Sequence, residues 1–200
     1  MSLRVRGLLM CAALATASGC ERVQAWFGEP AAEVEVTRRY AAEGLSFAYP
    51  GNWRLREEPG GAGDVELRTI VIESSGDALL LVQLFRPALA IDLDEHLELT
   101  TRTMAADLAG QGGGAGVEPG VVTAFEREWL GERRAARRGS ILVATPGQQA
   151  ASAIELFTAE LAGPAGCTVL VFTMIPDAGR ARAAAGFDLV LDTLAVDALQ

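Results

Sequence analysis

Short segments in which apolar and polar residues alternate begin at Val36, and turn residues separate them. Alternation of this kind predicts half-buried β-strands. The first two segments flank Glu43-Gly44, a two-residue break of the hairpin type. Ala78–Phe85 is apolar on both faces, which predicts a central strand covered on both sides. The expected strands are Val36–Ala42, Leu45–Pro50, Trp53–Arg56, Val65–Glu73, Ala78–Phe85, Val121–Leu130, Arg133–Ala144, Ala151–Glu160 and Cys167–Ile175.

Two segments have the spacing of amphipathic helices instead. The first runs from Asp92 to about Ala109, and Asp92 is the expected N-cap because its carboxylate can accept hydrogen bonds from the first free backbone N–H groups. The second runs from roughly Asp177 to Ala195. The apolar positions that define the two buried faces are Leu93, Leu97, Met104 and Leu108, and then Phe187, Val190, Leu191 and Leu194.

Gly-rich polar segments are expected to be loops, in particular Glu57–Asp64 and Gly110–Gly116, and a second hairpin is expected around Gly131-Glu132. No internal repeat is visible. The pattern therefore predicts one α+β domain at residues 36–200, in which a long mid-chain helix and a C-terminal helix pack on an antiparallel sheet.

The first 19 residues have the pattern of a secretory signal. Arg4 and Arg6 precede the uncharged apolar run Gly7–Ala17. This run is too short for a membrane-spanning helix, which needs about 20 residues, but it is typical of the core of a signal peptide. The run ends in Ala17-Ser18-Gly19-Cys20.

This ending resembles the lipobox of bacterial lipoproteins, although Ala17 stands where Leu is most usual. The resemblance implies that residues 1–19 are removed, that Cys20 becomes the lipidated first residue, and that residues 20–35 form a tether. It also implies attachment to a bacterial membrane. Glu21, in place of the Asp that retains enteric lipoproteins in the inner membrane, favours the periplasmic face of the outer membrane. An ordinary secretory signal cleaved elsewhere is the alternative.

The composition is that of a globular protein, with 50% apolar and 22% charged residues. The net charge of −9 repels phosphate backbones, so nucleic acid is not an expected partner. Cys11 would leave with the signal peptide, which leaves Cys167 without a thiol partner for an intramolecular disulfide. A lone cysteine within an apolar run is expected to be a small buried hydrophobic residue.

The segment "LSFAYPGNWRL" resembles the opening strand, turn and strand of PsbP-like domains. The positions that carry the resemblance are Phe47, Tyr49, Pro50 and Trp53. The later order of elements also matches, with a second meander whose turn contains Gly131. The resemblance covers about Val36 to Ala195 and implies an α/β sandwich. It implies binding or assembly roles and transfers no catalytic residue.

The sequence offers little catalytic chemistry. The single histidine, His96, has neither a second histidine nor a usable cysteine beside it, so it is expected to be a solvated surface residue. The same shortage argues against a nucleophile activated by histidine. We therefore expect no metal, no cofactor and no enzymatic activity.

One dense basic segment interrupts this acidic chain. It contains Arg133, Arg134, Arg137 and Arg138. These arginines predict a patch for an anionic partner, such as lipid head groups or an acidic protein surface. The alternative is a solvated hairpin whose arginines pair across the strands with Glu126 and Glu128.

The leading hypothesis is a non-catalytic, lipid-anchored envelope protein that binds or assembles with another envelope component, and the expected partner is a protein. The alternative is a module that binds a small molecule or lipid in a groove between sheet and helix, where Trp53 or Trp129 would line the pocket. A hydrolase with convergent carboxylates is the third hypothesis.

Overall fold

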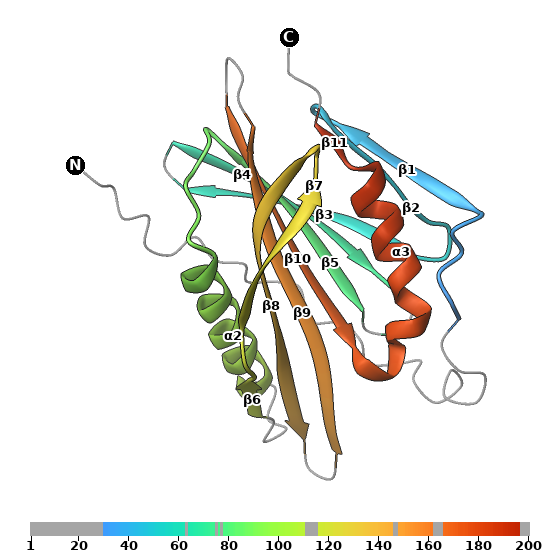
Figure 1. The fold of residues 1–200 in the computed structure, drawn as a ribbon, viewed down its shortest axis with the longest axis vertical. Coiled ribbons are helices and arrows are strands. Elements are labelled where there is room, and N and C mark those ends of the chain that lie inside the picture. The colour runs from blue at the N-terminus through green and yellow to red at the C-terminus, as the bar shows by residue number, and fades with distance from the viewer. Residues whose placement is uncertain are drawn as a thin grey trace.

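The described part of the chain folds into two antiparallel sheets and two long helices (Figure 1). The computed structural model describes residues 30–62, 64–74, 76, 78–110, 116–145, 148–161 and 166–196 of the 200-residue chain. The helices are α2 (Leu93–Gly110), the 3-10 turn η1 (Asp177–Gly179) and α3 (Arg180–Thr193). The strands are β1 (Thr37–Ala42), β2 (Leu45–Pro50), β3 (Arg54–Ala62), β4 (Val65–Glu73), β5 (Leu79–Arg86), β6 (Gly116–Pro119), β7 (Thr123–Trp129), β8 (Glu132–Thr145), β9 (Gln148–Leu161), β10 (Cys167–Pro176) and β11 (Ala195–Val196).

The larger sheet has the strand order β3-β4-β5-β10-β9-β8-β6, and β7 also pairs with β8. The smaller sheet has the order β1-β2-β11. β5 lies at the centre of the larger sheet, as its continuous apolar sequence predicts, and β10 lies beside it. The predicted α+β architecture, an antiparallel sheet with two helices of which one is C-terminal, is confirmed.

Each face of the larger sheet has its own hydrophobic core. Along β5, Leu80, Val82 and Leu84 belong to the core that α3 and the small sheet cover. Leu81 and Phe85 point the other way, into the core that contains Leu93 and Leu97 of α2. The helices therefore cover opposite faces, because successive side chains of a strand alternate between faces.

The predicted β1–β2 turn and the predicted N-cap of the mid-chain helix are confirmed. The β1–β2 hairpin turns at Glu43 (φ 48°) and Gly44 (φ 77°), the two-residue break that the sequence predicts. Asp92 caps α2, because its Oδ1 accepts hydrogen bonds from the backbone N–H groups of Asp94 (2.9 Å) and Glu95 (3.1 Å). The Met104 and Leu108 side chains of the predicted stripe lie outside the described residues.

The expected loop at Glu57–Asp64 is wrong. β3 continues to Ala62 and pairs with β4 along its whole length, so that Ala62 lies opposite Val65. β3 is the edge strand of the sheet, and an edge strand tolerates Pro59 because one side of its backbone needs no N–H donor. The short strands β6 and β11 are also additions to the predicted set.

The second hairpin turns at Leu130 (φ 53°) and Gly131 (φ 75°), so the predicted turn lies one residue late. Both residues have positive φ, as a two-residue turn of the favoured type requires. Leu130 is an unusual residue for this conformation, because a side chain with a branched body rarely adopts positive φ.

Residues that precede β1 already form hydrogen bonds with the folded domain. The backbone N–H of Ala32 donates to the carbonyl of Arg182 in α3 (3.0 Å), and Asn52 bonds both Ala31 and Glu33. The predicted signal peptide, Cys20 and residues 20–29 of the predicted tether lie outside the described residues, as do 111–115 of the predicted Gly-rich loop. Within the described part, none of the helices has the length and hydrophobicity needed to cross a membrane.

Candidate binding pocket

Strands β8 and β9 pair along only part of their length. Their ladder runs from Thr145 opposite Gln148 to Ala136 opposite Phe157. Beyond that pair, residues 132–135 of β8 pair with β7 alone, and residues 158–161 of β9 pair with β10 alone. The sheet therefore contains a fork, defined here as residues 132–135 and 158–161, in which two edges of the same sheet have no strand partner among the residues that the structure describes.

The packing of Trp129 explains the fork. Trp129 ends β7, is only 4% exposed and belongs to the core on the α3 side of the sheet. Its ring meets that of Phe157 edge-on, at a centroid distance of 5.0 Å. Burying an aromatic ring of this size is strongly favourable. The tip of the β7–β8 hairpin is thus drawn toward the α3 side, and β8 leaves the edge of β9 immediately after Phe157.

On the α2 side, the segment that joins β5 to α2 closes the base of the fork. Thr168 of β10 fixes this segment, because its Oγ1 accepts a hydrogen bond from the N–H of Leu89 (2.9 Å) and donates one to the carbonyl of the same residue (2.8 Å). Ile91 and Leu93 follow and present apolar side chains to the fork.

An ion pair fixes the start of α2 against β8. The Nε and Nη2 atoms of Arg137 bind Oδ1 and Oδ2 of Asp94, at 2.7 and 2.8 Å. This two-pronged hydrogen bonding lowers the pKa of Asp94 below its ordinary value. The helix and the hairpin that form two walls of the fork are therefore tied together.

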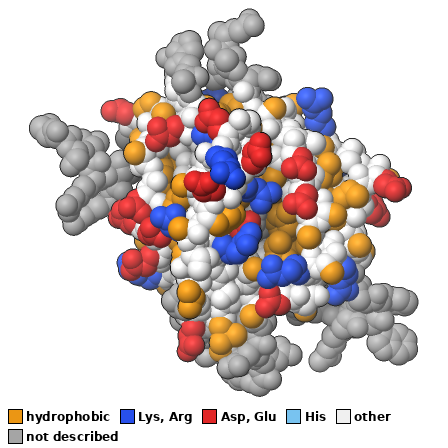
Figure 2. All heavy atoms as spheres, viewed as in Figure 1, with side chains coloured by type: hydrophobic (Ala, Val, Ile, Leu, Met, Phe, Trp, Pro, Cys, Tyr) orange, Lys and Arg blue, Asp and Glu red, His pale blue; other side chains and the backbone are white. Residues whose placement is uncertain are grey.

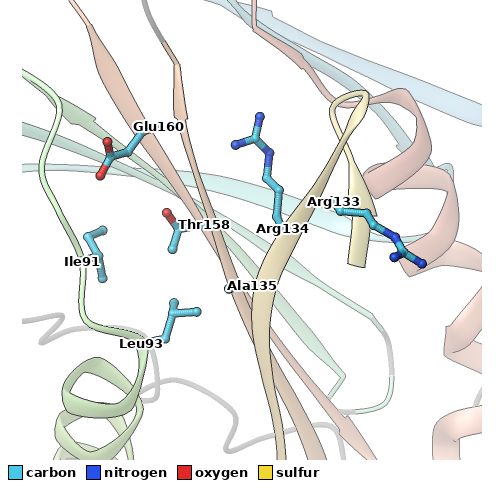
Figure 3. A pocket seen from close by; sticks show the side chains of 7 residues that line it. All are labelled: Ile91, Leu93, Arg133, Arg134, Ala135, Thr158 and Glu160. Carbon is cyan, nitrogen blue, oxygen red and sulfur yellow. The ribbon is translucent and has the colours of Figure 1, made fainter. Parts of the chain in front are cut away.

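A pocket of about 360 Å³ occupies the fork (Figure 3). β9 contributes two polar side chains, β8 contributes three residues of the hairpin, and the segment leading into α2 contributes two apolar side chains. The lining residues are Ile91, Leu93, Arg133, Arg134, Ala135, Thr158 and Glu160. Figure 3 shows Arg134 and Glu160 at the same end of the pocket, whereas the side chain of Arg133 is directed away from it.

The charged groups of the pocket differ in whether they already form hydrogen bonds or ion pairs within the protein. Nη2 of Arg134 lies 2.9 Å from Oε2 of Glu132, and its Nε donates to the carbonyl of Trp129 at 3.3 Å. Glu160 is exposed, and among the described residues no hydrogen bond or ion pair engages its carboxylate. The same holds for the hydroxyl of Thr158. The charge that the pocket leaves available is therefore negative.

The four arginines of the predicted patch do not form one surface. Arg137 lies on the α2 side, and Arg134 and Arg138 lie on the other side of β8, as strand alternation requires. Each guanidinium has a carboxylate partner among the described residues. The pairs are Arg133 with Glu126 (3.5 Å), Arg134 with Glu132 (2.9 Å), Arg137 with Asp94 (2.7 Å) and Arg138 with Glu155 (2.8 Å).

This arrangement matches the alternative interpretation, in which the arginines are paired, although only Glu126 is among the acids that the sequence indicated. Figure 2 shows the same mixture, with basic and acidic side chains interspersed over the face that it displays. Binding of an anionic partner at Arg133, Arg134, Arg137 and Arg138 stays a prediction, which the experiments below test.

Neither Trp53 nor Trp129, the tryptophans expected to line a pocket, lines the pocket at the fork. Trp53 is 2% exposed and Trp129 is 4% exposed, and both lie in the core on the α3 side. Trp53 packs edge-on against Phe187 of α3, with ring centroids 5.3 Å apart. Their size makes full burial in this core more favourable than a position at a pocket rim.

The expected environment of His96 is also wrong in part. His96 is half-buried on α2 rather than fully solvated, and this burial lowers its pKa below 6.5. Cys167 is a free thiol at the start of β10, partly buried against the core, as expected for a small hydrophobic residue. Burial raises the pKa of its thiol. Among the described residues, no group of three or more His, Cys, Asp or Glu side chains could hold a metal ion.

The pocket residues outside the basic segment were not found from the sequence. Ile91, Leu93, Thr158 and Glu160 come from segments that are far apart in the chain. Strand alternation placed Thr158 and Glu160 on one face of β9, but nothing in the local pattern indicates that β8 leaves β9 at Phe157.

No family model matches the sequence, and no curated protein sequence matches it. Among solved structures, the chain is similar to LpqN, which is involved in cell envelope biogenesis of Mycobacterium tuberculosis. The identity is 12% and the TM-score 0.42, over 81% of this chain and 90% of that chain. A likeness of this size does not bear on the function of this chain.

Proposed function

We propose that this chain is a lipid-anchored protein of the bacterial envelope that binds another envelope protein at the fork, without catalysing a reaction. The observation that carries the proposal is the pair of unpartnered strand edges around a pocket with an apolar base. Unpaired strand edges are sites where another chain can pair, and proteins usually cover or shorten them. Here both edges flank a pocket whose walls are fixed by Thr168 and by the Arg137–Asp94 pair.

The anchor follows from the N-terminal pattern. The charged start, the short apolar run and Ala17-Ser18-Gly19-Cys20 support lipidation of Cys20. A protein that carries two or more acyl chains stays on its membrane, because each buried methylene contributes about 0.8 kcal/mol. The periplasmic face of the outer membrane, favoured by Glu21, is part of the proposal.

Replacement of the anchoring cysteine tests the location. We expect Cys20→Ser to move the protein from the membrane pellet to the soluble fraction of the envelope. Cys11→Ser is the matched control, because that cysteine lies inside the predicted signal peptide, and it should leave the protein in the pellet. Sedimentation of the Cys20→Ser protein with membranes after a high-salt wash would show that the anchor assignment is wrong.

Filling the pocket tests the binding role. Ala135 lines the pocket and is exposed, so Ala135→Trp should block the pocket without disturbing the core. Ala124→Trp is the matched control, since Ala124 is exposed on the neighbouring strand β7 outside the pocket. An envelope protein that co-purifies with wild type and with the Ala124 variant, but not with the Ala135 variant, supports the proposal. Equal recovery by both variants contradicts it.

A second candidate function is the binding of a small molecule or lipid, and the volume of the pocket favours it. A pocket of about 360 Å³ lies within the range of small-molecule sites. Native mass spectrometry of wild type and the Ala135→Trp variant separates the two functions. A bound small molecule that is present only in wild type supports this second candidate.

A further inference from the structure

We propose that the occupant of the fork is a short, extended and basic segment of the partner protein, which adds as a strand to the free edge of β9. This inference rests on the proposed function and specifies the chemistry of the partner. Strand addition to an exposed sheet edge is a general mode of peptide recognition, in which backbone hydrogen bonds give affinity and side-chain pockets give specificity.

The backbone of the fork supplies the hydrogen-bonding groups. Residues 158–161 of β9 pair with β10 on one side, where Leu161 lies opposite Cys167, and with no described strand on the other. Alternate residues of a strand direct their N–H and C=O groups to the same edge, so about two residues of this stretch present both groups to the fork. An extended peptide can satisfy these groups, whereas a compact ligand cannot pair with them in series.

The length of the free edge limits the segment that can bind. Four residues of an extended strand span about 13 Å. A segment of four to five residues therefore fills the free edge, and a longer strand would meet the intact β8–β9 ladder at Phe157. The fork is a site for a short segment rather than for the edge of a second sheet.

The carboxylate of Glu160 favours a positively charged segment over a negatively charged one. Glu160 presents a carboxylate without a described partner, whereas the guanidinium of Arg134 at the same end is held by Glu132 and by the carbonyl of Trp129. A Lys or Arg of the segment gains a charge-assisted hydrogen bond with Glu160 without breaking an existing pair. An acidic segment would have to displace Glu132 from Arg134 and would lie beside Glu160.

The apolar base of the pocket favours an apolar residue in the segment, on the same face as the basic residue. Thr158 and Glu160 are two residues apart and share the α2 side of β9, where Ile91 and Leu93 also lie. Side chains of an added strand alternate between the two faces of the sheet. A segment with a basic residue and an apolar residue on one face therefore meets both Glu160 and the apolar base.

The test uses the full chain in detergent and three labelled peptides. The first is acetyl-Lys-Thr-Val-Thr-Lys-amide, in which both Lys residues and the Val share one face of the strand. The second has Glu in place of Lys, and the third has the Lys sequence with N-methylated backbone amides. Fluorescence anisotropy gives the affinities. We expect the Lys peptide to bind at least about tenfold more tightly than the other two, since hydrogen bonds to charged groups and lost backbone hydrogen bonds have effects of this size.

Variants of one exposed side chain make the test specific. Glu160→Gln should weaken binding of the Lys peptide about tenfold, and Glu160→Lys should reverse the preference in favour of the Glu peptide. Asp192→Asn is the control, because it removes one exposed carboxylate from α3 on the other face of the sheet. This control should leave the affinity for the Lys peptide unchanged.

Three results would overturn the inference. Equal or tighter binding of the Glu peptide would show that the arginines, not Glu160, recognise the partner. Unchanged binding of the N-methylated peptide would exclude strand addition. Concentration-dependent dimerisation that Ala135→Trp abolishes would show that a second copy occupies the fork.

These results are separable from the fate of the proposed function. If the Ala135→Trp variant loses an envelope partner but the Lys peptide does not bind, the fork binds a protein and the inference about an extended basic segment is wrong. If the variant loses no partner, the proposed function itself fails, whatever the peptides do.

Discussion

The indole of Trp53 occupies the space that a side chain at Gly186 of α3 would need. A Cβ atom built on Gly186 would lie 2.4 Å from both Cη2 and Cζ2 of Trp53, and 2.9 Å from Cγ of Pro50. Pro50 and Trp53 belong to the segment Leu45–Leu55 that the sequence analysis singled out. The structure places them against a glycine on the C-terminal helix, so one contact joins the turn between β2 and β3 to the last helix.

This contact predicts that Gly186→Ala destabilises the protein. Alanine is the better helix former by about 1 kcal/mol. The added methyl group, however, would collide with rigid ring atoms, and overpacking of a core costs about 1–3 kcal/mol. We expect a net loss of stability in urea unfolding monitored by circular dichroism.

A double-mutant cycle with Trp53→Phe checks the cause. Phenylalanine lacks the ring atoms that approach Gly186, so the two substitutions together should cost less than the sum of the single effects. Additive effects would contradict the assigned contact.

Gly131 gives a contrasting prediction. Its φ is +75°, and a Cβ added there would meet nothing within 4 Å. Gly131→Ala should therefore destabilise the hairpin only through its backbone conformation, by about 1–2 kcal/mol. Gly131→Asn should cost less, because Asn tolerates positive φ better than Ala. Equal unfolding midpoints for the Ala and Asn variants would contradict this explanation.

The half-buried position of His96 predicts a pH-dependent contribution to the free energy of unfolding. Because burial lowers the pKa of His96 in the folded state, the unfolded chain binds a proton more readily. The stabilisation of the folded state by neutral His96 is complete above the pKa of His96 in the unfolded chain, about 6.5. It is lost as the pH falls from that value toward the lower pKa of His96 in the folded protein. Wild type should therefore lose stability relative to His96→Gln between pH 7.5 and pH 5, values chosen to bracket about 6.5.

Urea unfolding of both proteins at the two pH values measures this difference. Comparison with the variant cancels the contributions of carboxylates such as Asp94, whose lowered pKa acts at more acidic pH. A constant stability difference between the two proteins would show that His96 titrates normally.

The raised pKa of Cys167 predicts a thiol of low reactivity. The thiolate is the nucleophile, and burial disfavours it. Alkylation of Cys167 by iodoacetamide, followed by mass spectrometry of its peptide, should be at least about tenfold slower in the folded protein than in urea. Similar rates in the two conditions would contradict the partly buried position.

The sequence was most informative where local chemistry decides the backbone. Glu43-Gly44 could be assigned to a two-residue turn and Asp92 to a cap, because both depend on residues close in the chain. The continuous apolar strand β5 could be placed at the centre of the sheet for the same reason. These features led to the correct fold class.

The site depended on relationships that local patterns do not contain. The end of the β8–β9 ladder at Phe157 depends on where Trp129 is buried, and the ion pair of Arg137 depends on the position of α2. Strand β3 continued through a Gly-rich stretch because β4 offered it a partner. These three features therefore depend on contacts between segments that are far apart in the sequence.

Photocrosslinking from the fork in living cells tests the central claim most directly. A small diazirine-bearing residue would be placed at Thr158 of the full chain, and at Asp192 as a control on the opposite face. After irradiation, we expect a covalent adduct with one envelope protein from position 158 and none from position 192. The absence of a protein adduct from position 158, or the same adducts from both positions, would contradict the proposal that the fork binds a partner.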